Sequence, residues 1–305
     1  MPPSHRGERL ATLLLVGVTA VWGSTFFLIR GLVRTIPPTD FLAVRFVIAA
    51  VVMGVAFRHQ SLALGRRELR IGLVLGLLYG SAQILQTTGL QHTSASVSGF
   101  VTGTYVVLTP IFGAVLLRDR LGGRTWVAVG LATVGLAVLS LRGFSIGVGE
   151  TLTLVAAAIY ALHIIGLGRW STPVNAVGLS TVQAGVIGLM CLVSALPGGI
   201  VLPRTPGQWG SMLYMALAAG VLALWAQTWG QAHLTATRAA IVMTLEPVWA
   251  AFFAVLFGGE SLTGRMVLGG LLVLTAMYVV ELHGRRAPDV PADIDPPAEA
   301  LHHEV

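Results

Sequence analysis

Residues 86–96 read QTTGLQHTSAS and residues 227–237 read QTWGQAHLTAT, so one short element occurs twice, 141 residues apart. Extending this alignment without gaps pairs residues 86–124 with residues 227–265, and 11 of the 39 positions are identical. Self-similarity over this length indicates that one structural unit is present in two copies.

The segments around the repeat are apolar enough to lie in lipid. Of the 305 residues, 55% are hydrophobic and 10% are charged, whereas a soluble domain carries about 25% charged residues. A helix needs about 20 residues to cross about 30 Å of hydrocarbon. Apolar runs of this length recur, and we place ten of them at 10–32, 39–57, 68–90, 94–117, 124–141, 149–169, 174–196, 209–231, 235–257 and 264–282.

The repeat and the spans together predict the architecture. Each copy holds five spans, and because five is odd, the second copy enters the membrane from the opposite side. The paired arginines Arg124 and Arg265 then lie at opposite faces. We predict an all-α integral membrane protein of ten transmembrane helices, arranged as two inverted five-helix repeats. Its parts are a cytoplasmic N-terminus (1–9), a first repeat (10–141), a connecting loop (142–148), a second repeat (149–282) and a disordered cytoplasmic tail (283–305).

The two copies differ in the position of a proline. Pro110 lies four residues after the position that Pro247 occupies in the second copy. Because proline removes a backbone hydrogen bond and bends a helix, we expect the bend of the fourth span to lie one turn further along.

The arginines predict the orientation. The chain has no lysine, and with the N-terminus inside, 13 of its 19 arginines fall in cytoplasmic segments and 5 in outer loops. Positive residues favour the cytoplasmic side of short loops. We therefore expect a multi-pass protein of the cell's inner (plasma) membrane with both termini in the cytoplasm.

Several functional classes are excluded by composition and motif. The net charge of +6 is dispersed over short loops and forms no basic face, so we expect no nucleic-acid partner. A single cysteine rules out a disulfide framework and a cysteine zinc site. The sequence holds no HExxH, no P-loop and no GxSxG motif. We expect no metal, no cofactor and no enzymatic activity.

Four stretches resemble a known family. They are AVWGSTFFLIR (20–30), FLAVRFVIAA (41–50), SGFVTGTYVVLTPIFGAVLLRDRL (98–121) and TRAAIVMTLEPVWAAFFAVLFGGESLTG (237–264). Together with the 5+5 repeat, they make the chain resemble the drug/metabolite transporter superfamily, of the EamA type. The resemblance covers both halves and implies a central cavity walled mainly by spans 1, 3, 4, 6, 8 and 9.

The resemblance also implies a function. It suggests a secondary transporter that exports small organic metabolites such as amino acids or drugs, by alternating access between the two inverted repeats. The alternative is a flippase for lipid-linked or amphipathic solutes, which the superfamily also includes. The expected partners are a small-molecule substrate and the lipid bilayer, and assembly as a homodimer is left open.

Polar and aromatic side chains recur at helical spacing in these spans. In the third span, Tyr79, Gln83 and Gln86 fall at i, i+4 and i+7 and share one face. Such groups either face the bundle interior or bond to backbone and neighbouring helices. We predict that the substrate contacts Trp22, Thr25, Tyr79, Gln83, Gln86, Thr102, Tyr105, Tyr160, His163, Trp225, Gln227, Met243 and Glu246.

Two charged residues lie within spans. Glu246 is near the middle of the ninth span, beside Pro247, where a carboxylate is costly. It is our candidate for proton coupling or for binding a substrate amine. The alternatives are that it stays protonated, or that it bonds to backbone groups freed by the proline kinks. Arg45 lies one to two turns from the outer end of the second span, and we interpret it as structural, paired with Glu246, Asp40 or headgroups.

Overall fold

A computed structural model describes residues 5–117, 122–142, 145–172, 174–234 and 242–281. The predicted tail (283–305) and the first residues of the predicted N-terminus lie outside this part of the chain. The first helix begins at His5, earlier than the apolar run that predicts it.

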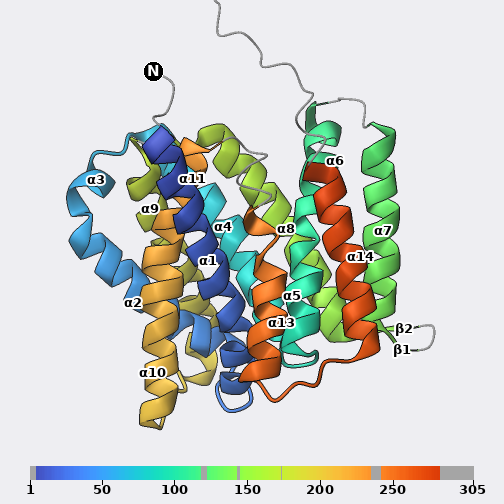
Figure 1. The fold of residues 1–305 in the computed structure, drawn as a ribbon. Helices are drawn as coiled ribbons and strands as arrows, with labels where there is room; N and C mark the ends of the chain where they lie inside the picture. Colours follow the sequence, from blue (N-terminus) through green and yellow to red (C-terminus); the bar gives the residue numbers. More distant parts are fainter. Residues whose placement is uncertain (1–4, 118–121, 143–144, 173, 235–241, 282–305) are drawn as a thin grey trace, which may run out of the picture.

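The described chain is almost entirely helical, with one two-residue pair of strands (Figure 1). The longer elements of the first half are α1 (His5–Leu32), α2 (Pro38–Ala56), α4 (Arg66–Gly89), α5 (Ala95–Gly103), α6 (Tyr105–Leu117) and α7 (Gly123–Ser140), with a short α3 (Arg58–Leu62). Strands β1 (Leu141–Arg142) and β2 (Ser145–Ile146) pair antiparallel in the predicted connecting loop. The second half holds α8 (Val148–Trp170), α9 (Ala176–Ala195), η1 (Leu196–Gly198), α10 (Pro206–Tyr214), η2 (Met215–Leu222), α11 (Ala223–His233), α13 (Glu246–Leu256) and α14 (Gly264–Glu281).

Seven of the described helical stretches are long and apolar enough to cross a membrane. They are Arg9–Leu32, Pro38–Ala56, Arg66–Gly89, Ala95–Leu116, Val148–Trp170, Ala176–Gly198 and Pro206–Gln231. Three shorter apolar helices follow the same pattern, namely Gly123–Leu139, Glu246–Leu256 and Gly264–Val279. Each of the ten predicted runs overlaps one of these ten stretches.

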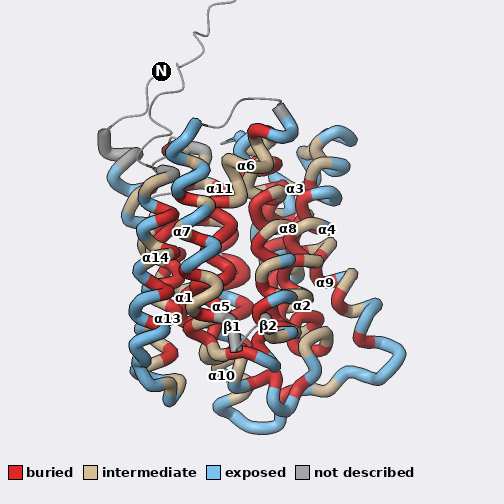
Figure 2. Tube along the Cα trace, turned by 90° about the vertical axis from the view of Figure 1, so that its right-hand side faces the viewer, coloured by how far each residue is buried: buried red, intermediate tan, exposed pale blue. Residues whose placement is uncertain are grey.

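The outer surface of the bundle is apolar. Exposed residues line its periphery while the buried ones gather inside (Figure 2), and many of the exposed residues are large hydrophobics such as Leu13 (69%), Val55 (73%) and Leu268 (55%). A soluble protein does not expose apolar surface on this scale. These faces suit lipid, and the protein is a multi-pass membrane protein.

Small residues let two central helices approach closely. On α4, Gly72, Gly76 and Gly80 repeat every fourth residue and face α9. A Cβ atom on Gly76 would lie 2.7 Å from Cβ of Val186. A side chain at these positions would force the helices apart, as is typical of small residues at membrane helix contacts.

The helices of the two halves pack on one another in matching pairs. Helix α7 packs on α14 and α2 packs on α9. Two more contacts come in matching pairs. The contact of α4 with α8 matches that of α11 with α1, and the contact of α6 with α8 matches that of α13 with α1. Helix α5 crosses α13 at the centre. The contacts of α4 and of α6 with α8 therefore have counterparts with the halves exchanged, and the core lies along the seam between the halves.

Two interruptions lie beside this crossing. Thr104 separates α5 from α6, and α13 begins at Glu246 after a turn at Leu245. Under the 141-residue alignment, Thr104 and Leu245 are equivalent positions. Pro110 lies inside α6, so the proline does not mark the break. The two interruptions thus lie at matching positions of the repeat. The offset of one turn that the prolines predict is not found.

Candidate functional site

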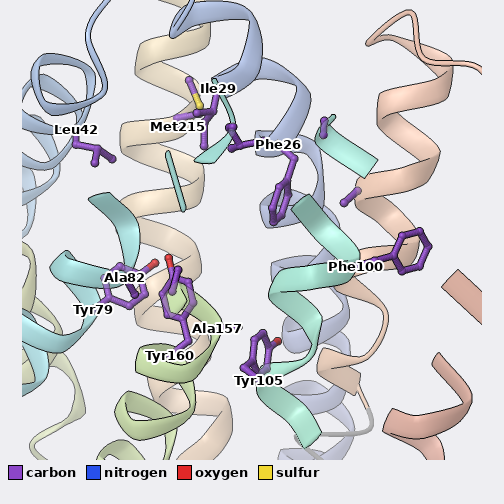
Figure 3. Close-up of a cluster of buried hydrophobic side chains, with 14 of the residues drawn as sticks. Phe26, Ile29, Leu42, Tyr79, Ala82, Phe100, Tyr105, Ala157, Tyr160 and Met215 are labelled. Atoms are coloured by element: carbon purple, nitrogen blue, oxygen red, sulfur yellow. The ribbon is translucent and has the colours of Figure 1, made fainter. Parts of the chain in front are cut away.

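A cavity lies between the two halves at mid-height. Its volume is about 50 Å³, which is room for a few waters. A pocket for a small organic ligand is larger, at roughly 300 Å³ or more. Figure 3 shows three of the tyrosines that line it, with Tyr79 and Tyr160 side by side and Tyr105 on α6. Its walls are Trp22, Thr25, Phe26, Ile29, Arg45, Tyr79, Gln83, Gln86, Thr102, Tyr105, Tyr160, His163, Ile164, Gln227, Met243 and Glu246.

The structure brings together most of the residues singled out from the sequence. Trp22, Thr25, Tyr79, Gln83, Gln86, Thr102, Tyr105, Tyr160, His163, Gln227, Met243 and Glu246 all line this cavity.

Trp225 does not line the cavity. It packs beside Val18, Ala223 and Ala226, with its ring 6.5 Å from that of Trp229. The reason is the pitch of α11. Residues two apart on a helix point about 200° from each other, so Trp225 faces away when Gln227 faces the cavity.

Glu246 occupies the first turn of α13 and is 7% exposed. Its Oε2 accepts a hydrogen bond from the hydroxyl of Tyr105 at 3.0 Å. The position is a favourable one for a carboxylate, because the N-terminus of a helix carries a partial positive charge. Tyr105 and Glu246 are 141 residues apart, which makes them equivalent positions of the two repeats.

A chain of hydrogen bonds joins α4, α5 and α8 along the cavity wall. The hydroxyl of Tyr160 donates to Oε1 of Gln86 at 3.2 Å, and Nε2 of Gln86 donates to Oγ1 of Thr102 at 2.9 Å. One turn away, Nε2 of Gln83 donates to the hydroxyl of Tyr79 at 3.1 Å. These bonds hold the polar side chains in one orientation around the cavity.

His163 is tied to α9. Its Nε2 lies 2.7 Å from Oε1 of Gln183, whose Nε2 in turn donates to the backbone oxygen of Leu179. The imidazole also packs against the ring of Tyr79, with centroids 5.1 Å apart. His163 thus touches the cavity while its side chain is fixed by a structural bond.

The sequence interpretation of Arg45 as structural misses its place in the cavity wall. The side chain is 2% exposed, its Nε donates to the backbone oxygen of Met215 at 3.2 Å, and its guanidinium lies 4.9 Å from the centre of the Phe46 ring. It forms no direct ion pair with Glu246 or Asp40. The signal that could have found it is a lone arginine inside an apolar run.

Three apolar wall residues were also missed. Phe26, Ile29 and Ile164 line the cavity, and Ile29 lies one turn beyond Thr25 on α1, so helical spacing alone could have added it.

Two amide oxygens in the wall have no hydrogen-bond partner among the described residues. They are Oε1 of Gln83 and Oε1 of Gln227, and their side chains are 6% and 3% exposed. Buried polar atoms are nearly always paired with protein groups or water. Both side chains line the cavity, so a molecule carrying N–H or O–H groups could supply the missing partners if the side chains turned toward it.

The chemistry of the cavity is that of binding. It presents one carboxylate, one guanidinium, hydroxyls, amides and apolar faces. Within the described part of the chain, no group of three or more His, Cys, Asp or Glu side chains is placed to hold a metal ion.

A second carboxylate joins the two halves at one end of the bundle. Glu260, between α13 and α14, accepts hydrogen bonds from the backbone nitrogens of Ala95 (2.6 Å) and Ser96 (3.2 Å) and from Oγ of Ser96 (2.6 Å). It also pairs with Nη1 of Arg30 at 3.2 Å. We call these contacts the Glu260 clasp, and they join the second half to the ends of α1 and α5 in the first.

Comparison with known proteins agrees with this architecture. The EamA-like transporter family matches the chain twice, over residues 9–141 and 147–282. A crystal structure aligns with a TM-score of 0.64 at 20% identity, covering 90% of this chain and 98% of that one, which supports the fold alone.

Relatives in other organisms are named as transporters. An "Uncharacterized transporter" of Archaeoglobus fulgidus is 30% identical, over 89% of this chain and 86% of its own. The "Uncharacterized inner membrane transporter YedA" of Escherichia coli is 25% identical (88% and 89%), and its "Probable amino-acid metabolite efflux pump" is 24% identical (88% and 93%). With both halves matched and relatives aligned over most of their length, the chain belongs to the EamA-like transporter family.

Proposed function

We propose that this protein is a secondary carrier of small organic metabolites such as amino acids, working by alternating access between two inverted five-helix halves. It would export its solute across the cell's inner membrane, with both termini in the cytoplasm. The single observation that carries the mechanism is the hydrogen bond between Tyr105 and Glu246.

That bond supports a two-fold relation between the halves. Tyr105 and Glu246 are equivalent positions of the repeat. A residue and its own counterpart can touch only close to the axis that relates the two copies. The matching helix contacts, such as α7 with α14 and α2 with α9, have the same origin. An axis in the membrane plane, with a site beside it, is the design of carriers built from inverted repeats.

The size of the cavity supports the movement. With about 50 Å³ open to water-sized molecules, a solute of amino-acid size enters only when the helices part. The Glu260 clasp ties the two halves together at one end. A cycle in which the clasp opens while the opposite end closes would expose the cavity to each side in turn.

The solute class is supported by the relatives and by the wall. The efflux pumps of Escherichia coli and Salmonella typhimurium are named for amino-acid metabolites. The cavity of this chain combines polar anchors with apolar faces at Phe26, Ile29 and Met243, which is the usual character of a small-molecule site.

The carrier function is tested by counterflow. Purified protein in proteoliposomes is loaded with unlabelled solutes from an amino-acid and metabolite panel, and uptake of the labelled solute is followed. We expect transient accumulation of at least one solute, abolished in Tyr105→Ala. Absence of counterflow for every panel member, in protein shown to be folded, would refute the carrier function.

The inverted arrangement is tested by labelling. In a Cys191→Ser background, Arg124→Cys and Arg265→Cys place single thiols at repeat-equivalent positions, both of which are exposed. We expect a membrane-impermeant maleimide outside cells to label position 265 and not position 124. Labelling of both from one side would contradict the arrangement.

Proton coupling through Glu246 is the finer part of the proposal. Its carboxylate bonds to Tyr105, and the other titratable or charged groups in the wall are Arg45, Tyr79, Tyr160 and His163. Transport by the wild type and by Glu246→Gln is compared across pH in proteoliposomes. We expect the glutamine variant to lose its dependence on pH, and an unchanged dependence would remove the idea.

A further inference from the structure

We propose that the cavity binds a zwitterion, with Arg45 holding its carboxylate and Glu246 holding its ammonium group. This rests on the proposed carrier function and specifies the solute it takes, namely an amino acid with an apolar side chain. The inference starts from two opposite charges that share one cavity and do not pair with each other.

Arg45 is a cation with donors to spare. A guanidinium carries five N–H donors and stays charged in proteins. The described residues engage one of them, through the bond from Nε to the oxygen of Met215. The Arg45 side chain lines the cavity, and a guanidinium matches a carboxylate, which it binds through two parallel hydrogen bonds.

Glu246 is an acceptor with one oxygen to spare. Tyr105 donates to Oε2, and within the described part of the chain Oε1 receives no hydrogen bond. The side chain lies in the cavity wall at 7% exposure. An ammonium group placed against Oε1 would neutralise the carboxylate without displacing Tyr105.

The buried charges favour an occupant that carries both signs. A charge removed from water costs free energy unless it is paired. A purely cationic solute would leave Arg45 uncompensated, and a purely anionic one would leave Glu246 uncompensated. A zwitterion satisfies both groups, and its N–H donors also suit the unpaired oxygens of Gln83 and Gln227.

The rest of the wall points to an apolar side chain. Phe26, Ile29, Ile164 and Met243 border the same cavity. The indole nitrogen of Trp22 is engaged with the oxygen of Ala219 at 3.0 Å, so its ring offers a surface and no free donor. An aliphatic or aromatic amino acid fits this pattern better than a charged one.

The test compares solutes that differ in the charged groups they carry. Binding of leucine, leucinamide and N-acetyl-leucine to the purified full-length protein is measured by calorimetry, with γ-aminobutyrate as a zwitterion of wider charge spacing. We expect leucine to bind about 10- to 100-fold more tightly than the amide and the N-acetyl compound, the range for losing a hydrogen bond to a charged partner. It should also bind more tightly than γ-aminobutyrate, which has no apolar side chain.

Variants assign each charge to its partner. In Glu246→Gln, leucine should lose its advantage over N-acetyl-leucine, and in Arg45→Gln it should lose its advantage over leucinamide. Arg45→Lys keeps the positive charge and should keep the order of affinities of the three leucine compounds. This variant is used if Arg45→Gln does not fold. The matched control is Glu150→Gln, since Glu150 is a buried carboxylate outside this cavity, bonded to Thr93.

The outcomes separate this inference from the carrier function. If leucine binds no better than leucinamide and N-acetyl-leucine, the inference is overturned, and counterflow of an uncharged or cationic solute would still leave the carrier function standing. If the zwitterion binds with the expected pattern but no solute shows counterflow, the binding site stands and the carrier function falls.

Discussion

Removing the Glu260 clasp should open the end of the bundle that it closes. The perturbation is Glu260→Ala, which deletes the acceptor for Ala95 and Ser96 and the ion pair with Arg30. Because these contacts join the two halves, they stabilise only the conformation in which this end is closed. A contact that favours one conformation shifts the equilibrium by the difference in its free energy between the two conformations.

The magnitude follows from the exposure of the partners. The Glu260 side chain is 11% exposed and the Arg30 side chain 31%. Hydrogen bonds to a charged acceptor contribute about 1.5–3 kcal/mol each in buried settings, but water replaces much of this when the clasp opens. An ion pair as exposed as Arg30 adds about 0–1 kcal/mol. We take a net 2–3 kcal/mol, which raises the open population about 30- to 150-fold.

The assay is the reactivity of a thiol inside the cavity. Ile29→Cys is placed in the Cys191→Ser background, and the protein is inserted in nanodiscs so that a maleimide reaches both ends. We expect the modification rate to rise by the factor above in Glu260→Ala. Arg204→Ala, which removes an exposed charge from the loop before α10, is the control and should leave the rate unchanged.

Two results would refute this reasoning. One is an unchanged rate in Glu260→Ala. The other is an equal rise in the control, which would indicate general loosening of the bundle.

Three further predictions follow from single contacts. Gly76→Leu should lower stability by about 1–3 kcal/mol by overpacking, seen as a lower melting temperature of a fluorescent fusion, while Gly17→Leu should not, because nothing lies within 4 Å of a Cβ there. Tyr105→Phe should slow counterflow several-fold in the wild type and have little further effect in Glu246→Gln, and additive losses would argue against their coupling. Trp225→Ala should lower the melting temperature yet leave solute affinity unchanged, and a loss of affinity would place this residue in the site after all.

Much of the candidate site could be predicted from helical spacing. Polar residues such as Tyr79, Gln83 and Gln86 repeat with the period of one helix face, and an apolar environment leaves that face only the bundle interior. The spacing also explains the failure at Trp225, because residues two apart cannot share a face. Arg45 was missed because a position near a helix end suggests that the side chain reaches the interface, whereas a backbone oxygen on a neighbouring helix holds it inside.

The fold shows the same division. The apolar runs overlap the described helices, since length and hydropathy indicate where a helix can cross a membrane. The interruption at Thr104 could not be read from the local sequence, which draws attention to Pro110. It lies where α5 crosses α13 and depends on that packing. The Glu260 clasp could not be predicted from the sequence either, because it depends on contact between a loop and the start of a helix 164 residues away in sequence.

The meeting of Tyr105 with Glu246 has a consequence for how such a chain can arise from two copies of one segment. In the proposed arrangement, two identical halves related by a two-fold axis would place the same side chain of each copy in contact at this point. Two carboxylates there would repel or share one proton, and two phenols would carry no charge to offer a solute. Joining the copies in one polypeptide removes that constraint, because each copy can then change alone. Under the proposed two-fold arrangement, the sole carboxylate among the cavity-lining residues requires that the two copies differ at the position where symmetry would otherwise pair identical side chains.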